Sequence, residues 1–330
     1  MKIEWKRTRL ELKETFSISY GNYDFRDGLL VAISAKEKTG FGECIAINYY
    51  GINLDEFEQK LEVIKPLIEG YELQHPKDFF KMLKSLDLHS FLLSSLDCAF
   101  WDLYGKIEGK TFSEINHLNT NDLPESSYTI SIGEVADQIE KINKSSWGKF
   151  KVKCKGLDRE NIFKLLETGK GISLDSNTSF SDEDCMFLQE NFLSQNFLYI
   201  EQPRPVGEYD VLDKYKNVNW MADEDCQDIS YLERLQPHYS TINIKLMKCG
   251  GLTPALELIG EARKYGYKIM IGCMTESSVG ISAGIAIAGL CDFADLDGAS
   301  LISNDFARGS YVENGKLILS KEPGLGISLL

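Results

Sequence analysis

Hydrophobic and polar positions alternate over the first 20 residues, beginning with Ile3 and Trp5, and an apolar run follows at 28–35. A period of two predicts β-strands with one buried face. The stretch EKTGFGECI places Gly40 and Gly42 after these runs, a composition typical of a turn. The chain is therefore expected to begin with an antiparallel sheet.

Three helical patterns follow this sheet. Residues 53–70 carry apolar side chains at helical spacing, with Asn53 placed to cap the start and Gly70 at the end. Helical spacing continues at 76–87 and 89–107, and the second of these stretches is apolar on most sides, which predicts a buried helix. The first part of the chain is thus expected to form an α+β unit.

The rest of the chain repeats a short β-type run followed by an amphipathic stretch. The interval of about 22–27 residues is that of successive βα units in a parallel barrel. No helical pattern follows the eighth run, and the last residues look like a hairpin and a tail. We therefore predict an α/β fold: a capping domain at 1–120, a modified TIM barrel of the (β/α)7β type at 121–308, and a tail at 309–330 that returns to the cap. The predicted strands are 126–132, 150–155, 171–177, 198–203, 219–225, 241–246, 268–273 and 293–298.

Charged side chains stand at the carboxyl ends of most of these strands, where the active site of such a barrel lies. For any one of them, a solvated strand end or a surface ion pair is an equally good explanation. Independent surface charges are not expected to recur at the same point of successive units. Strand alternation predicts that Asp223 and Asp225 share a face and that Glu224 points the other way. The strand-end charges are Lys151, Lys153, Asp175, Glu201, Asp223, Lys245, Asp295 and Asp297.

These charges sort by chemistry. Asp175, Glu201 and Asp223 come from three consecutive predicted strands and supply hard oxygen ligands, which suit Mg²⁺ better than Zn²⁺ or copper. Lysines on the second and sixth strands would face each other across this metal. A crowded, partly desolvated lysine is expected to have a lowered pKa and to act as a base. A substrate carboxylate held between the lysines could lose its α-proton to one of them and regain a proton from the other, which inverts a stereocentre.

At this point the residues resemble the enolase superfamily, specifically its muconate-lactonizing subgroup. The similarity covers nearly the whole chain and rests on five motifs in order, which together are far more specific than any one of them. The motifs are K-x-K at Lys151–Lys153, D-x-N at Asp175–Asn177, E-Q-P at Glu201–Pro203, A-D-E at Ala222–Glu224, and Lys245 followed by Gly-Gly.

The resemblance implies roles for several of these residues. It implies one Mg²⁺ held by Asp175, Glu201 and Asp223. It also implies that Lys153 and Lys245 are the acid/base pair. Lys151 would then help to hold the substrate carboxylate, and the N-terminal unit would be a cap completed by the C-terminal tail.

Two further features are similar to those of dipeptide epimerases: the sequence GCMTESSVGISAGIAIAG after the seventh strand, and the D-x-D of Asp295 and Asp297 on the eighth. In that family the paired carboxylates receive the free α-ammonium group of the dipeptide, a role that suits acceptor-only groups. A solvated strand end is the alternative for this pair. Ser131 is a further implied substrate contact, although it could equally be a hydrogen-bonding residue of the barrel. The remaining implied contacts are Cys273, Met274 and Thr275.

The best-known dipeptide epimerases act on Ala-Glu released from bacterial cell-wall peptide, and carry a basic residue near position 20 that meets the glutamate side chain. Here that loop reads SYGNYDFRDG, with Gly21 at the matched position and Arg26 as its only arginine. Arg26 is interpreted either as a specificity residue or as a surface charge. An L-Ala-D/L-Glu epimerase of cell-wall peptide metabolism is the leading expectation, and the departure at Gly21 leaves its side-chain preference open.

Other functions stay open beside this one. The chain could be an epimerase of other dipeptides, an N-acylamino-acid racemase or an o-succinylbenzoate synthase. The last two share the metal and the lysines, but their substrates lack the ammonium group that Asp295 and Asp297 would receive. A non-catalytic barrel that binds a small acid is the alternative outside enzymes, and the complete set of lysines and carboxylates argues against it.

Composition and net charge limit the kinds of binding partner that the chain is expected to have. The net charge is −14 at pH 7, which disfavours nucleic acid and anionic membrane surfaces. The amino terminus lacks the apolar segment of a signal peptide, and no apolar run is long enough to span a bilayer. The 8 cysteines show no C-x-x-C spacing and are expected to be reduced thiols of a cytoplasmic protein. The expected partner is a small-molecule dipeptide, and the sequence leaves a homo-oligomer open.

Overall fold

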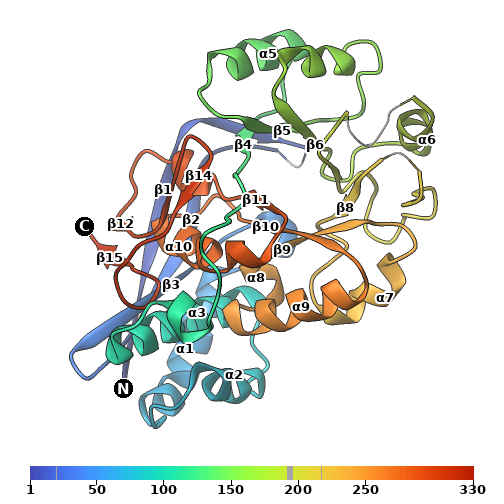
Figure 1. Ribbon diagram of the computed structural model, residues 1–330. Helices are drawn as coiled ribbons and strands as arrows, with labels where there is room; N and C mark the ends of the chain where they lie inside the picture. Colours follow the sequence, from blue (N-terminus) through green and yellow to red (C-terminus); the bar gives the residue numbers. More distant parts are fainter. Residues whose placement is uncertain (20, 192–195, 217) are drawn as a thin grey trace.

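The computed structural model describes residues 1–19, 21–191, 196–216 and 218–330. An antiparallel sheet with helices packed on it forms the N-terminal part, and a parallel barrel follows (Figure 1). This arrangement confirms the predicted fold class.

The N-terminal sheet consists of β1 (Lys2–Ile18), β2 (Gly21–Ala35) and β3 (Lys38–Ile45), paired in that order. Strand β2 begins earlier than the apolar run at 28–35 suggests. The residues around Arg26 therefore belong to a strand rather than to a loop, because the pairing of β1 with β2 continues to Ile18 and Gly21.

The three predicted helices are α1 (Leu54–Glu69), α2 (Pro76–Lys84) and α3 (Ser90–Glu108), and α4 (Phe112–Ile115) follows them. The Asn53 side chain caps α1 by accepting a hydrogen bond from the backbone N–H of Asp55 at 3.0 Å, as expected. A 3₁₀ helix at Asn48–Tyr50 lies between β3 and α1.

Helix α3 is buried because it lies between the sheet and the barrel. Gly40 and Gly42 of β3 let its backbone approach closely, since a Cβ on either would come within 2.1 Å of a backbone oxygen of α3. Phe100 of this helix belongs to the core of the N-terminal unit, whereas Trp101 belongs to the core of the barrel. The glycines that suggested a turn thus serve helix–sheet packing.

Eight parallel strands form the barrel in sequential order. Between the first and the last strand, Ser126 bridges to Ala294, and the N–H of Ser127 donates to the Ala294 carbonyl at 3.0 Å. The strands are β4 (Tyr128–Ile130), β5 (Lys149–Lys153), β6 (Gly171–Asp175), β7 (Ile200–Glu201), β8 (Trp220–Ala222), β9 (Thr241–Lys245), β10 (Lys268–Gly272) and β11 (Phe293–Asp295).

The connections are less regular than seven full βα units. Between β5 and β6 the chain forms only a 3₁₀ helix, Ile162–Thr168. Between β7 and β8 the described residues form no helix. Pro203 and Pro205, which lack an N–H donor, lie at the start of this connection. The α-helices of the barrel are α5 (Val135–Lys144), α6 (Asp182–Asn191), α7 (Leu232–Leu235), α8 (Leu246–Cys249), α9 (Leu252–Lys264) and α10 (Ser278–Ile287), with 3₁₀ helices at Ile229–Tyr231, Ala288–Leu290 and Gly298–Ser300.

The C-terminal segment forms short strands. Strand β12 (Ala307–Arg308) pairs with β15 (Ser328–Leu329), and β13 (Tyr311–Glu313) forms a hairpin with β14 (Lys316–Ile318). The tail contacts α3, where the Lys106 ammonium donates to the Ile327 carbonyl at 2.7 Å and Asp102 accepts from the N–H of Leu325 at 2.8 Å. The domain boundaries themselves stay a prediction.

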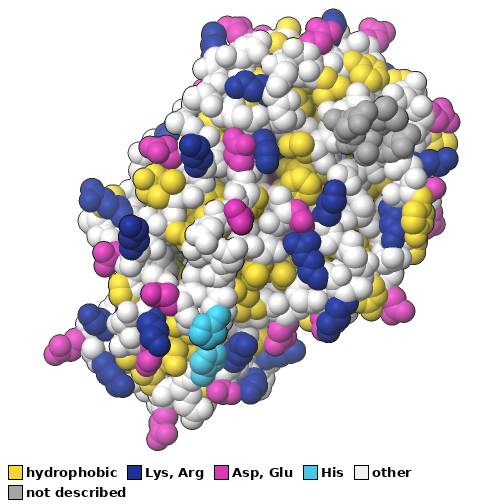
Figure 2. Space-filling model, in the orientation of Figure 1, with side chains coloured by type: hydrophobic (Ala, Val, Ile, Leu, Met, Phe, Trp, Pro, Cys, Tyr) yellow, Lys and Arg dark blue, Asp and Glu magenta, His cyan; other side chains and the backbone are white. Residues whose placement is uncertain are grey.

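Charged side chains of both signs are interspersed on the face of the molecule that Figure 2 shows. Within the described residues, none of the helices combines the length and the apolar character that crossing a membrane requires.

A buried carboxylate joins the N-terminal unit to the barrel. Glu43 of β3 accepts hydrogen bonds from the backbone N–H groups of Ser277, at 2.8 Å, and Gly280, at 3.0 Å, at the start of α10. Burial raises the pKa of Glu43 to about 7, with a further contribution from Asp305. Burial and the neighbouring Glu43 raise the pKa of Glu276 to about 8, although Lys245 opposes this. The two carboxyl groups therefore lie together in a site that disfavours their full ionisation.

This pair predicts that the protein loses stability as the pH rises. Both folded-state pKa values exceed the ordinary value, so the folded chain binds more protons than the unfolded chain between about pH 4.5 and 8. The free energy of unfolding should decline across that window. Glu276→Gln should reduce the decline by roughly 1–3 kcal/mol, whereas Glu257→Gln, on the exposed face of α9, should not. Urea unfolding at several pH values measures this, and equal declines in both variants would contradict it.

Candidate active site

Parallel register brings the predicted strand-end residues to one edge of the barrel. Lys153 pairs with Asp175, and Asp175 with Glu201, on adjacent strands β5, β6 and β7. On the other side, Gly272 of β10 pairs with both Lys245 and Asp295. The charges that the sequence spaces along the chain therefore lie side by side, as expected from strand ends of a barrel.

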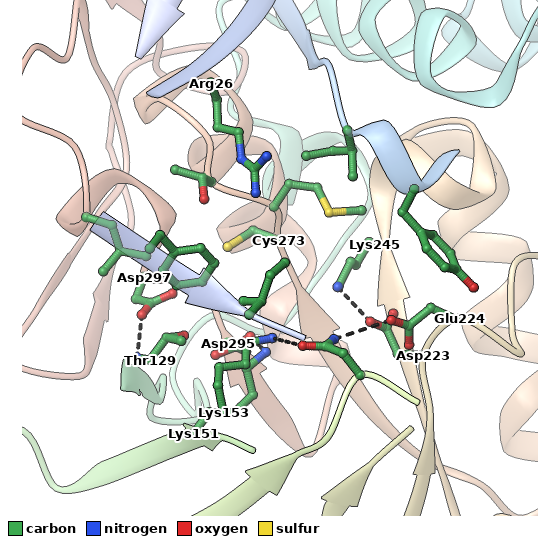
Figure 3. A pocket seen from close by; sticks show the side chains of 18 of the residues that line it. Arg26, Thr129, Lys151, Lys153, Asp223, Glu224, Lys245, Cys273, Asp295 and Asp297 are labelled. Carbon is green, nitrogen blue, oxygen red and sulfur yellow. Dashed lines mark hydrogen bonds and ion pairs between the residues drawn. The ribbon is translucent and has the colours of Figure 1, made fainter. Parts of the chain in front are cut away.

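Each of the three predicted lysines contacts a buried carboxylate. Lys153 donates to Asp175, and the Lys245 ammonium lies 2.8 Å from Asp223 Oδ2. These lysines lie on different sides of a cavity, with Lys245 near Asp223 and Glu224 and Lys153 on the side of Lys151 (Figure 3). The arrangement places two proton-carrying groups on opposite walls.

The third lysine, Lys151, sits among several acids. It donates to Asp295, and its Nζ lies 3.5 Å from Glu201 Oε2 and 3.7 Å from Asp175 Oδ2. In this state Lys151 holds the neighbouring carboxylates together, rather than leaving its ammonium free for a substrate.

The predicted lowering of the lysine pKa is wrong for Lys151 and Lys245. Burial by itself lowers the pKa of Lys245, but the attraction of Asp223 and Glu201 outweighs it, so that the pKa stands above its ordinary value. The same balance raises the pKa of Lys151, where Asp295 is the strongest neighbour. The spacing of the sequence motifs predicted that several lysines lie in one site. It did not predict that each lysine lies closer to a carboxylate than to another lysine.

Of the three predicted metal ligands, Asp223 lines the cavity, whereas Asp175 and Glu201 are buried and contact the lysines that line it. Asp175 Oδ1 accepts from the N–H of Asn177 at 3.0 Å, and Glu201 Oε1 accepts from Asn243 Nδ2 at 2.8 Å. Glu201 Oε2 is buried without a hydrogen-bond partner, and burial together with repulsion from Asp175 raises the pKa of Glu201 to about 8. Burial opposes ionisation of Asp223, but Lys245 and other lysine contacts hold its pKa below the ordinary value.

The donor set fits a hard divalent cation, but the side chains are arranged around lysines. No group of three or more carboxylate, histidine or cysteine side chains in the described part of the chain is placed to hold a metal ion. The carboxylates turn toward ammonium groups instead. A metal at Asp175, Glu201 and Asp223 would require these ion pairs to loosen, and Glu201 Oε2, which accepts no hydrogen bond, is the atom that a cation would satisfy.

Asp295 and Asp297 both line the cavity, although β11 ends at Asp295. Asp297 Oδ2 accepts a hydrogen bond from the backbone N–H of Thr129 at 2.6 Å, and Asp295 Oδ1 is buried without a partner. Burial and the neighbouring Asp295 raise the pKa of Asp297 to about 7. Lys151 is the positive charge beside Asp295 here, and acceptor-only carboxylates of this kind suit an ammonium group.

The cavity has a volume of about 90 Å³. Lys151, Lys153, Lys245 and the turn at 273–275 line it from the barrel. Apolar and aromatic side chains line it from the N-terminal unit. These are Phe16, Ile18, Ile47, Tyr49 and Tyr50.

Arg26 is not a surface charge. Its side chain is only 5% exposed and lines the cavity, and its guanidinium carbon lies 3.5 Å from the centroid of the Tyr23 ring. Within the described residues Arg26 has no ion pair, and its Nε has no hydrogen-bond partner. The structure therefore places a buried positive charge in the part of the site that the N-terminal unit covers. Gly21, the position matched by resemblance, carries no side chain there.

Two of the predicted orientations differ from the structure. Ser131 does not line the cavity, because β4 ends at Ile130 and the inward position belongs to Thr129; Ser131 lines a neighbouring depression beside Lys141. Asp223 and Glu224 both line the cavity, since β8 ends at Ala222 and strand alternation stops there. Asp225 points away, and accepts a hydrogen bond from the Tyr239 hydroxyl at 2.8 Å.

Four further polar residues in the barrel part of the site were not predicted. Thr129 and Glu224 were missed because β4 and β8 end earlier than the predicted strands do. Asn177 lines the cavity and is part of the D-x-N motif, which was read for its aspartate alone. Lys248, one helical turn after Lys245, is buried and donates to both a side-chain and a backbone oxygen of Asp223. The sequence signal for Lys248 was its spacing of three residues from Lys245, which places the two side chains on one face where a helix begins.

Comparison with known proteins agrees with this geometry. Residues 134–330 match the family described as Enolase C-terminal domain-like. The chain is 37% identical to the L-Ala-D/L-amino acid epimerase of a Maribacter species, covering 100% of this chain and 99% of the relative. It is 33% identical to the L-Ala-D/L-amino acid epimerase of Flavobacterium johnsoniae, covering 100% of both.

A solved structure of a dipeptide epimerase from Methylococcus capsulatus, complexed with Mg and the dipeptide L-Arg-D-Lys, is 27% identical. It superposes with a TM-score of 0.89 over 99% of each chain. The chain therefore belongs to the enolase superfamily, as an isomerase of its dipeptide epimerase group.

Proposed function

We propose that the protein is a Mg²⁺-dependent epimerase that inverts the α-carbon of the C-terminal residue of a dipeptide, with L-Ala-D/L-Glu as its substrate type. The observation that carries the proposal is the placement of Lys153 and Lys245 on opposite walls of one buried cavity. The name of the Methylococcus relative adds that a similar protein binds both Mg and a dipeptide.

The balance of buried charges supports the proposed binding of Mg²⁺. Ten ionisable side chains of the barrel are buried around the cavity, and with Arg26 counted the six carboxylates exceed the positive charges by one when all are ionised. A divalent cation would offset this negative charge. The acids are Asp175, Glu201, Asp223, Glu224, Asp295 and Asp297, and the lysines are Lys151, Lys153, Lys245 and Lys248.

In this proposal Asp175, Glu201 and Asp223 would hold Mg²⁺, which would supply positive charge against the negative charge that develops on the substrate carboxylate. Lys153 takes or gives the α-proton on one face of the substrate, and Lys245 does so on the other. Burial alone favours the neutral amine of Lys245, so its ion pair with Asp223 must weaken for it to accept a proton.

The other cavity residues orient the substrate. Asp295 and Asp297 receive the α-ammonium group of the dipeptide, and the Thr129 N–H fixes the Asp297 carboxylate. Lys151 turns from Asp295 toward the substrate carboxylate. Arg26 faces the side chain of the C-terminal residue, where a carboxylate would satisfy its buried guanidinium.

A second substrate class has support of its own. Phe16, Ile18 and Ile47 give the cavity an apolar wall, and the two similar relatives are named for amino acids in general rather than for glutamate. Dipeptides with an apolar second residue are therefore the alternative to Ala-Glu.

The two-lysine mechanism predicts that Lys153→Ala and Lys245→Ala each lower epimerisation by at least about 1,000-fold, because each removes the proton carrier of one face. Each variant should keep exchange of the α-hydrogen with D₂O for one epimer only, through the remaining lysine. NMR of both epimers of Ala-Glu in D₂O measures inversion and exchange together.

Lys149→Ala is the matched control, since Lys149 starts the same strand at the other end of the barrel. Mg²⁺ binding, followed by calorimetry, should persist in both lysine variants because the carboxylates remain. Near-normal turnover in either variant would refute the mechanism. Exchange with N-acylamino acids but with no dipeptide would point to a racemase of acylated substrates instead.

Arg26→Met tests the preference for glutamate. The variant keeps most of the side-chain length but removes the charge, so kcat/KM for L-Ala-L-Glu should fall about 10- to 100-fold. The value for L-Ala-L-Leu should change less than about threefold, since that substrate makes no ion pair. Arg9→Met, which removes an exposed arginine paired with Asp27, is the control. Equal losses on both dipeptides would exclude Arg26 as the source of specificity.

A further inference from the structure

We propose that Asn177 is a positioning residue that orients Lys153, and that it ties this orientation to the β1–β2 hairpin. The inference rests on the proposed function and adds a residue whose effect falls on one face of the substrate. Asn177 follows β6, is buried and lines the cavity.

The carboxamide of Asn177 has one orientation that satisfies its neighbours. Its Oδ1 accepts a hydrogen bond from Lys153 Nζ at 3.2 Å, and its Nδ2 donates to Glu224 Oε1 at 3.3 Å. An ammonium group can only donate, so the amide cannot turn over without losing its contact with Lys153. Asn177 therefore fixes where the Lys153 ammonium lies relative to Glu224.

The backbone of Asn177 is held in an uncommon conformation. Its φ angle is +41°, and two neighbours, Thr178 at +72° and Gln202 at +35°, are also left-handed. Such angles cost free energy in residues other than glycine, although asparagine tolerates them best, and they persist only where surrounding contacts enforce them. Here the enforcing contacts include the Asn177 N–H, which donates to Asp175 Oδ1.

The same residue reaches the N-terminal unit. The Ser19 hydroxyl, at the end of the β1–β2 hairpin, donates to the Asn177 carbonyl at 2.9 Å. This hairpin also carries Arg26 and Phe16 into the cavity. A substrate that draws the hairpin onto the barrel would thus act on Asn177, and through it on Lys153.

Among the described contacts, Asn177 bonds to Lys153 but not to Lys245, which is paired with Asp223 on the other wall. Loss of the Asn177 side chain should therefore misplace the proton carrier of one face and leave that of the other in place. Epimerisation rates cannot show this, because the equilibrium constant links the forward and reverse values. Exchange with retention of configuration can show it, because each epimer meets only one lysine.

Asn177→Gly is the sharpest variant, because glycine adopts the positive φ without strain while the carboxamide is lost. We expect α-hydrogen exchange with retention to fall at least about tenfold more for one epimer of the dipeptide than for the other. The affected epimer should be the one that also loses exchange in Lys153→Ala. Mg²⁺ affinity measured by calorimetry should stay within about threefold of the wild-type value, which shows that the Asp175 site is intact.

Thr178→Gly is the matched control, since it removes the next side chain at another left-handed position, and it should leave the exchange ratio unchanged. Ser19→Ala should shift the ratio in the same direction as Asn177→Gly by a smaller factor, and an unchanged ratio there would overturn the tie to the hairpin. Equal losses for both epimers in Asn177→Gly would overturn the positioning role alone. A wild-type protein that exchanges no dipeptide would overturn the proposed function and this inference with it.

Discussion

Buried ammonium groups and carboxylates at the carboxyl end of the barrel constrain the rest of the site. Asp175, Glu201 and Asp223 are almost fully buried, as are Lys151 and Lys245. Charges in such surroundings are tolerable only when each has a partner of opposite sign. The site therefore holds its lysines in ion pairs that a cation and a substrate must exchange for new contacts, and its resting charge distribution decides which ligands are accepted.

This exchange requires that the partners be held in place while their charges are redistributed. Parallel register supplies part of the rigidity, because Lys153, Asp175 and Glu201 stand opposite one another on adjacent strands. The turns after β6 and β7 supply another part through their left-handed residues, among them Asn177. Strain stored in these turns is consistent with a preorganised site, where side chains keep their positions as protons move.

The sequence predicted the fold and the strand-end residues because both follow from local periodicity. A period of two along each strand, and the regular spacing of the strands, determine which charges meet at one edge. Glu224 and Ser131 were misplaced because alternation ends with the strand, and the direction of the next side chain depends on the turn that follows. The rise in the pKa of Lys245 could not be predicted, since it depends on which of several nearby charges lies closest.

The position of Arg26 in the cavity could not be predicted from local periodicity either, because it depends on how the N-terminal unit packs over the barrel. The buried lysines and carboxylates of the cavity come from the barrel, whereas Arg26, Phe16 and Ile18 come from the β1–β2 hairpin. A substitution in this hairpin changes what the cavity wall offers to a substrate side chain without removing a partner from the buried ion pairs. The division between the two units thus allows the hairpin wall of the cavity to vary while the buried ion pairs of the barrel are kept.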